Sequence, residues 1–107
     1  MIVPQTRLLI WFAAVALPAA LIEELARKNL SVDILINNAG FGDFGPFVDS
    51  DPARQVDMIE LNVTALTELT RLLLPGMVSR KWGRVMNVAS TAAFQPGPLM
   101  SVYYATK

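Results

Sequence analysis

The chain has 107 residues, and nine lysines and arginines balance nine aspartates and glutamates, so its formal net charge at pH 7 is zero. No run of one sign is longer than a pair, so we expect no nucleic-acid partner and no electrostatic contact with a membrane surface. Cysteine and histidine are absent, which excludes disulfides, thiol or imidazole catalysis and the usual transition-metal sites, and we expect no metal. Any proton transfer must use tyrosine, lysine, carboxylate or hydroxyl groups.

Residues 1–16 form an apolar leader in which Arg7 is the only charged side chain. An arginine, an apolar run from Leu8 to Leu17 and small residues after it are typical of a secretory signal, which would export the protein. The run is too short for a comfortable transmembrane helix, so we expect no membrane span. We interpret the leader as uncleaved apolar padding that supplies at most one strand, which makes the protein cytoplasmic, with export as the alternative.

The next segments predict a helix followed by a strand. Pro18 suits the first turn of a helix that ends near Asn29, with leucine and isoleucine on one face and charged residues on the other. The apolar run from Val32 to Asn37 is typical of a strand buried on both faces. A glycine-rich loop follows from Ala39 to Phe47.

The second half of the chain repeats this alternation. Asp51 as N-cap and Pro52 as first residue predict a long amphipathic helix that runs to about Ser79 and is kinked or divided by Pro75. Arg84 to Ser90 reads as a second buried strand, and a proline-rich stretch then leads into a final helix. The alternation predicts an α/β fold, a partial Rossmann-like doubly wound parallel sheet in which the two strands are adjacent and the long helix connects them.

Small and polar residues follow both predicted strands. Because the carboxyl ends of parallel strands share one edge of a sheet, these residues are candidate ligand contacts. Ordinary turn chemistry explains asparagine and glycine at such positions equally well. The residues are Asn37, Asn38, Ala39 and Gly40 after the first strand, and Ala89, Ser90 and Thr91 after the second.

Asn62 lies in the middle of the apolar stripe of the long helix, because Ile59, Leu66 and Leu69 fall within about 60° of it on a helical projection. A buried amide without partners costs a few kcal/mol. Asn62 is therefore either a satisfied structural residue or a member of a polar network at a site.

Two tyrosines and a lysine close the sequence. Tyr103 and Lys107 are four residues apart and share a helical face. An ammonium about 4 Å from a phenol favours the phenolate by about 4 kcal/mol at an effective dielectric constant near 20, which would suit the tyrosine to proton transfer. Tyr104 is the rival, but its side chain points about 100° away.

Four features in order resemble the classical short-chain dehydrogenase/reductase family. They are the sequence NNAG at 37–40, Asn62 in the following helix, Ser90 at the end of the next strand, and Tyr103-x-x-x-Lys107. The separation of Ser90 and Tyr103 is similar to the family pattern and selects Tyr103 over Tyr104. The resemblance covers residues 17–107, the central part of a Rossmann domain, whereas residues 1–16 do not resemble the family.

The resemblance implies hydride transfer between the nicotinamide of NAD or NADP and a carbonyl or alcohol carbon of a small molecule. In that reaction Tyr103 is the general acid and base, Ser90 holds the substrate oxygen, Asn62 anchors a water, and Lys107 contacts the nicotinamide ribose. The cofactor would be lined by Asn37, Ala39, Gly40, Tyr103 and Lys107. The family also implies a homo-oligomer at full length, with the long helix at a subunit interface.

The sequence also departs from the family pattern. No glycine precedes Gly40, so the glycine-rich turn that holds the cofactor pyrophosphate in the family is absent from this chain. Family members also continue beyond the catalytic lysine. We therefore expect a fragment truncated at both ends of the fold that is inactive by itself. The alternative is a non-catalytic module that keeps the middle of the fold and binds a partner.

Overall fold

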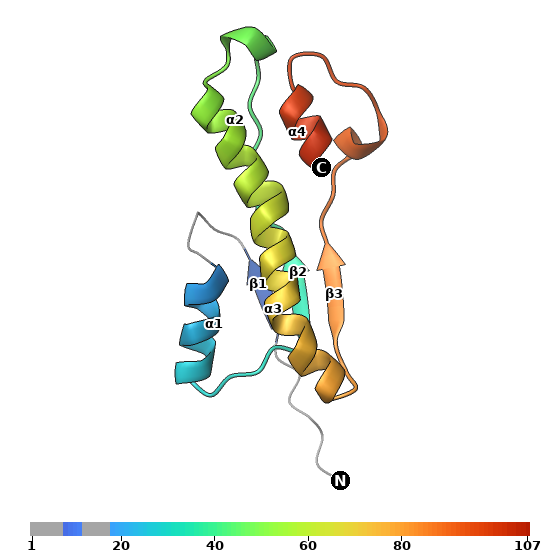
Figure 1. Ribbon diagram of the computed structural model, residues 1–107. Coiled ribbons are helices and arrows are strands. Elements are labelled where there is room, and N and C mark those ends of the chain that lie inside the picture. Colours follow the sequence, from blue (N-terminus) through green and yellow to red (C-terminus); the bar gives the residue numbers. More distant parts are fainter. Residues whose placement is uncertain (1–7, 12–17) are drawn as a thin grey trace.

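A computed structural model describes residues 8–11 and 18–107 of the chain (Figure 1). Strands and helices alternate along the sequence, as the pattern predicted. The rest of the leader lies outside the described residues. The elements are β1 (Leu8–Trp11), α1 (Pro18–Arg27), β2 (Ile34–Asn37), α2 (Pro52–Ile59), the π-helix η2 (Glu60–Ala65), α3 (Leu66–Ser79), β3 (Arg84–Asn87) and α4 (Ser101–Thr106), with short 3-10 helices η1 (Phe47–Asp49) and η3 (Thr91–Phe94).

The described strands form one parallel sheet in the order β1-β2-β3. Ile34 is paired with Arg84 and Asn37 with Asn87, so β2 and β3 end at the same level. The long helical segment 52–79 connects these two strands (Figure 1). The prediction of adjacent parallel strands joined by the long helix is therefore confirmed. The leader contributes β1, which pairs with the other side of β2.

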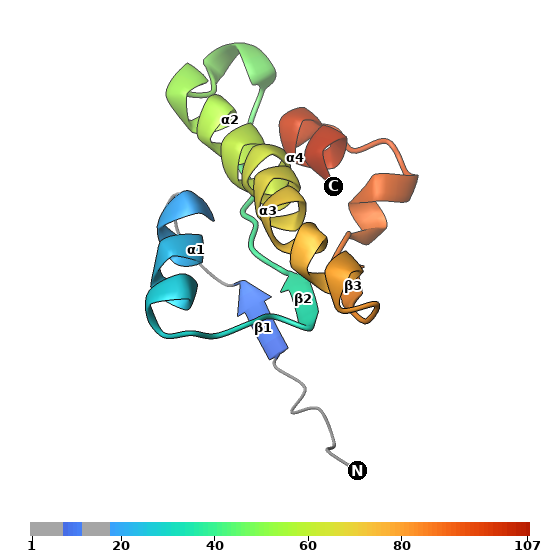
Figure 2. The ribbon, with the colours of Figure 1, turned by 60° about the horizontal axis from the view of Figure 1, so that its bottom comes forward.

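The core lies between β2 and the helices α1 and α3, which are on the same side of the sheet (Figure 2). Leu35 of β2 and Leu69 of α3 are fully buried. Burial of one such side chain contributes about 1.5–3 kcal/mol. The same cluster contains Val32 and Met77, against which Leu21, Ile22, Leu25 and Leu73 pack.

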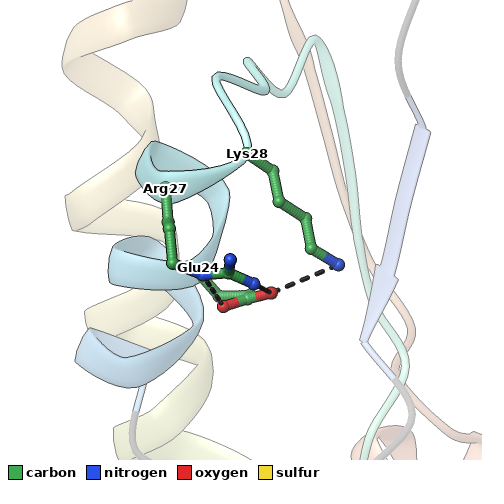
Figure 3. Close-up of polar contacts among 3 residues, drawn as sticks. All are labelled: Glu24, Arg27 and Lys28. Carbon is green, nitrogen blue, oxygen red and sulfur yellow. Dashed lines mark hydrogen bonds and ion pairs between the residues drawn. The ribbon is translucent and has the colours of Figure 1, made fainter.

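An exposed ion-pair cluster lies at the C-terminal end of α1. Glu24 accepts hydrogen bonds from the guanidinium of Arg27, the shorter of them 2.6 Å long, and its carboxylate lies 3.2 Å from the ammonium of Lys28 (Figure 3). Hydrogen bonds from Arg27 and then Lys28 lower the pKa of Glu24. Positive charges in the last turn also suit the helix dipole.

The long helical segment begins as predicted but is interrupted elsewhere. The Asp51 side chain accepts a hydrogen bond of 3.0 Å from the backbone N–H of Ala53, and Pro52 is the first residue of α2. Pro75 lies inside α3 and does not divide it. Pro75 and Arg71, four residues earlier, are both exposed, so water can reach the carbonyl that a proline leaves unbonded. The interruption is η2, a wider π turn between α2 and α3.

Two strand predictions are corrected in part. All four residues of β3 are exposed, with Met86 at 52%, so β3 is not a buried strand. It lies at one edge of the described sheet, whereas the core helices pack over β2. In β2, Leu35 and Asn37 are buried but Ile34 and Ile36 are half-buried, so only one face is fully covered.

Within the described ranges, no helix is long and apolar enough to cross a membrane.

Candidate active site

Gly40 lies where the chain leaves β2, and two polar side chains converge on it. A Cβ atom added to Gly40 would lie 3.0 Å from Oδ1 of Asn62 and 3.1 Å from Nζ of Lys107. Asn62 comes from η2, and Lys107 directly follows α4. Three segments that are far apart in the sequence therefore meet at the carboxyl end of the sheet. Gly40 therefore has little room for a side chain, because even one Cβ atom would crowd an amide oxygen and an ammonium group.

Asn62 is 4% exposed, and both the oxygen and the nitrogen of its amide are hydrogen-bonded within the protein. Its Oδ1 accepts a hydrogen bond of 3.1 Å from the N–H of Phe41, and its Nδ2 donates one of 3.0 Å to the carbonyl of the same residue. The second Nδ2 proton is donated to Oγ1 of Thr106 at 2.9 Å. Asn62 is therefore a satisfied buried amide that also belongs to a polar network beside Gly40. Both amide protons are used within the protein.

Lys107 links α4 to the end of β3. Its Nζ donates a hydrogen bond of 3.1 Å to the carbonyl of Val88, and its backbone N–H donates one of 3.1 Å to the carbonyl of Tyr103. Val88 in turn donates its N–H to the carbonyl of Asn37 at 2.9 Å. These bonds hold the positive charge of Lys107 at the level where β2 and β3 both end.

The structure separates the two tyrosines of α4. The ring of Tyr103 faces the loop after β2, since a Cβ atom on Gly42 would lie 3.2 Å from its Cγ and Cδ2. The ring of Tyr104 packs against Gly97, where an added Cβ atom would collide with it. The two rings meet edge to face, with centroids 6.2 Å apart. Tyr103 is thus the tyrosine on the side of Gly40 and the glycine-rich loop.

A pocket lies beside Tyr103, between the glycine-rich loop and the segment before α4. The N–H of Gly45 donates a hydrogen bond of 2.8 Å to the carbonyl of Leu99, which joins the two walls. Leu99 has a φ of 65°, a left-handed conformation that a branched residue adopts only under constraint. The residues that line the pocket include Asp43, Gln55, Met58, Met100 and Tyr103.

Ser90 follows β3 and caps the short helix η3. Its Oγ accepts a hydrogen bond of 3.1 Å from the N–H of Ala92. This bond uses an oxygen lone pair rather than the hydroxyl proton. Among the hydrogen bonds of the described part of the chain, none joins Ser90 to Tyr103 or Lys107. The structure places Ser90 at the same end of the sheet as these two residues.

The Asn37 side chain is turned into the protein. It is 3% exposed, and its Nδ2 donates hydrogen bonds of 3.1 Å to Oγ1 of Thr70 and 2.8 Å to Oδ1 of Asn87. Its own Oδ1 is buried without a hydrogen-bond partner. Asn37 therefore ties β2 to α3 and β3 beneath the edge where Ala39 and Gly40 lie.

The family model described as short chain dehydrogenase matches residues 14–107. The chain belongs to this family. The fold and family predicted from the sequence are confirmed.

Within the described ranges, no group of three or more acidic, cysteine or histidine side chains is arranged to hold a metal ion.

Curated members of the short chain dehydrogenase family share this part of the sequence. The chain is 41% identical over 93 residues to a D-beta-hydroxybutyrate dehydrogenase of Cupriavidus necator, an alignment that covers 83% of this chain and 36% of that protein. It is 38% identical over 83 residues to a human very-long-chain 3-oxoacyl-CoA reductase, with 74% of this chain and 27% of that protein covered. The chain thus spans about a third of the length of the curated relatives that it matches.

Solved structures of short chain dehydrogenases have the same arrangement. Serine dehydrogenase from Escherichia coli superposes with a TM-score of 0.76 at 38% identity, over 83% of this chain and 43% of that chain. A 4-hydroxyisoleucine dehydrogenase complexed with NADH gives a TM-score of 0.79 at 26% identity, over 88% of this chain and 44% of that chain.

Two residues of the candidate site were not predicted from the sequence. Phe41 offers only its backbone to Asn62, and no side-chain pattern signals such a contact. The contact of Thr106 is weakly indicated by the sequence, because a threonine three residues after Tyr103 in a helix can donate its hydroxyl proton to the tyrosine carbonyl. The structure shows that bond, with a length of 2.9 Å.

Proposed function

We propose that the protein containing this chain is an NAD- or NADP-dependent oxidoreductase that transfers hydride between the nicotinamide and a carbonyl or alcohol carbon of a small molecule. The observation that carries this proposal is the convergence of Asn62 and Lys107 on Gly40, with Tyr103 one helical turn before the lysine. The motif residues that imply the reaction thus come from separate elements to one edge of the sheet.

The surface at Gly40 suits the approach of a nicotinamide dinucleotide, because a glycine has no side chain and lets a ligand come close to the backbone. It presents an acceptor, Asn62 Oδ1, and a charged donor, Lys107 Nζ, to whatever lies in front of the glycine. Such a pair suits the hydroxyl groups of a ribose. We propose that Ala39, Gly40, Tyr103 and Lys107 line the cofactor, while Asn37 holds the strand ends beneath them. When bound, the nicotinamide supplies or accepts the hydride.

The side chains divide the remaining work. In the direction of reduction, the Tyr103 phenol donates its proton to the oxygen of the substrate carbonyl, and in oxidation the phenolate accepts it back. Ser90 uses its hydroxyl proton to hold and polarise the substrate oxygen. Asn62 fixes the loop and α4 and orients water in the proton path.

The substrate is proposed from chemistry that the relatives share. One relative is named for a hydroxy acid and another for a 3-oxoacyl group, so hydroxyl and ketone functions recur. We propose a secondary alcohol or the corresponding ketone. Both apolar and polar side chains border Tyr103 on this side, including Met58, Met100, Asp43 and Gln55.

We also propose a cytoplasmic homo-oligomer for the whole protein. Apolar side chains are exposed along the long helical segment, with Val56 at 55%, Ile59 at 42% and Val63 at 41%. A face of this kind favours association. The same exposed face is what favours the alternative function, a non-catalytic module that binds a partner protein through the long helix.

Turnover measurements on the longest natural polypeptide that carries this sequence distinguish the two functions. Secondary alcohols and ketones are offered with each dinucleotide, and the absorbance of the reduced nicotinamide is followed. We expect turnover that Tyr103→Phe lowers by about 10²–10⁴-fold, because general acid-base catalysis is lost. The matched control is Tyr104→Phe, since the ring and its packing on Gly97 are kept. Nicotinamide-dependent turnover that survives Tyr103→Phe would contradict the proposal.

A further inference from the structure

A threonine at an unspecified position of the Tyr103-x-x-x-Lys107 motif connects the buried amide of η2 to the helix that carries Tyr103. Oγ1 of Thr106 accepts a hydrogen bond of 2.9 Å from Nδ2 of Asn62 and donates one of 2.9 Å to the carbonyl of Tyr103. The hydroxyl thus acts as acceptor and donor at the same time. It is half-buried, and it is next to Lys107 in the chain.

The direction of these two bonds restricts which side chains can replace the threonine. Both amide protons of Asn62 are donated, one to Phe41 and one to Thr106. The residue at 106 must therefore accept from one side while it donates to a carbonyl on the other. Serine can do both, whereas valine, which has the same shape as threonine, can do neither.

The position of Tyr103 and Lys107 depends on how α4 is held. Within this chain α4 comprises Ser101–Thr106 and is directly followed by Lys107. The carbonyl of Tyr103 accepts hydrogen bonds from Oγ1 of Thr106 and from the backbone N–H of Lys107, so the last turn of α4 closes on that oxygen. Among the side-chain hydrogen bonds of the described residues, Asn62 to Thr106 is the one that joins this turn to η2.

We infer that Thr106 is a positioning residue for the proposed reaction, which sets the places of Tyr103 and Lys107 relative to Gly40 through its bond to Asn62. This inference rests on the proposed function. Without the hydroxyl, Asn62 keeps its two bonds to Phe41, so the loop after β2 stays in place while α4 loses its link to η2. Small misplacement of a reacting group can cost about 10²-fold in rate.

The test is a set of threonine variants in the natural protein, assayed at saturating cofactor and substrate. We expect Thr106→Val to lower kcat by about 10–100-fold with little change in KM, because positioning acts in the transition state more than in ground-state binding. Thr106→Ser should retain kcat to within about threefold, since the two bonds are kept. The matched control is Thr67→Val. It removes an exposed hydroxyl that donates a hydrogen bond of 2.8 Å to the Val63 carbonyl.

A spectroscopic readout accompanies the kinetics. The side-chain amide protons of Asn62 should shift in NMR spectra of Thr106→Val and return toward their original positions in Thr106→Ser. If the valine variant does not fold, Thr106→Ala takes its place, and unfolding of both would overturn the inference because the hydroxyl would then serve folding. An unchanged kcat in Thr106→Val, or an equal loss in Thr106→Ser, would also overturn it. A wild-type protein without nicotinamide-dependent turnover would instead overturn the proposed function on which the inference rests.

Discussion

Asn62 Oδ1 and Lys107 Nζ lie 3.0 Å and 3.1 Å from the point that a Cβ atom on Gly40 would occupy, although the two residues are 45 residues apart in the sequence (107 − 62). The amide is held by the loop that contains Gly40, and the ammonium is held by the carbonyl of Val88. Each group is thus fixed by backbone atoms at the end of a different strand. The geometry of the candidate site follows from the parallel pairing of β2 and β3.

A methyl group at Gly40 should disturb the site without unfolding the chain. The added Cβ would lie 3.0 Å from Asn62 Oδ1 and 3.1 Å from Lys107 Nζ, so the flexible lysine end must move. Among the described glycines, only Gly45 has a positive φ, and backbone strain at Gly40 does not contribute. In the natural protein, we expect Gly40→Ala to weaken the binding of NADH or NADPH about tenfold, measured by calorimetric titration. We expect the same substitution to lower the free energy of unfolding by about 1 kcal/mol.

Gly76→Ala is the matched control for this substitution. The added Cβ would meet the guanidinium of Arg80, with Nη1 at 3.0 Å, on the far part of α3. Alanine is favoured over glycine in a helix by about 1 kcal/mol. The control should therefore keep cofactor binding and equal or exceed the wild-type stability. An equal loss of cofactor binding in Gly40→Ala and Gly76→Ala would contradict a specific role of Gly40 in binding the cofactor.

Asn62→Ala should destabilise the fold. It removes three hydrogen bonds and leaves the N–H and carbonyl of Phe41 without their partner. Buried polar groups that lose their partner cost about 1–3 kcal/mol each, so we expect a loss of about 2–4 kcal/mol in urea unfolding. Asn38→Ala, at an exposed asparagine of the same loop, should change stability by less than about 0.5 kcal/mol. Similar effects of the two substitutions would refute this account.

Leu35→Ala tests the core that holds the sheet against the helices. Leu35 is fully buried in the cluster with Leu69 and Met77. We expect a loss of about 2–5 kcal/mol in the free energy of unfolding, because the truncation leaves a cavity. Leu72→Ala serves as control, since Leu72 is 47% exposed on α3 and should cost well under half as much. A smaller effect at Leu35 than at Leu72 would show that the core lies elsewhere.

The ion-pair cluster of α1 predicts a specific pH dependence (Figure 3). Arg27, and then Lys28, lower the pKa of Glu24 from its ordinary value of 4.5. A carboxyl whose pKa is lower in the folded chain stabilises the fold above its unfolded pKa, and this contribution is lost as the pH falls through the folded value. The stabilisation should therefore disappear in the acid range below 4.5, and its size should be small because the group is exposed.

NMR titration of the Glu24 side chain measures this pKa directly. Arg27→Gln should raise the pKa of Glu24 toward its ordinary value, since the hydrogen bond from Arg27 is the largest cause of the shift. Lys28→Gln should raise it less, because Lys28 is the second cause. A larger change from the lysine substitution would reverse the assignment.

Several features were determined by sequence alone because they depend on local chemistry. The N-cap at Asp51, the first helical residue Pro52 and the alternation of helices and strands follow from backbone propensities and hydrophobic period. The burial of Asn62 could also be predicted from the sequence, since its place in the apolar stripe of a helix is a local property. The order of the motif residues was enough to indicate the family.

Tertiary structure decided what depends on partners distant in sequence. The exposure of β3 reflects its edge position, which its own apolar residues do not encode. The partners of Asn62 are backbone atoms of Phe41 and a hydroxyl 44 residues away, and neither contact has a sequence pattern. The different surroundings of Tyr103 and Tyr104, beside Gly42 and Gly97, were likewise decided in space, because a side chain faces whichever surface the packing of its helix leaves in front of it.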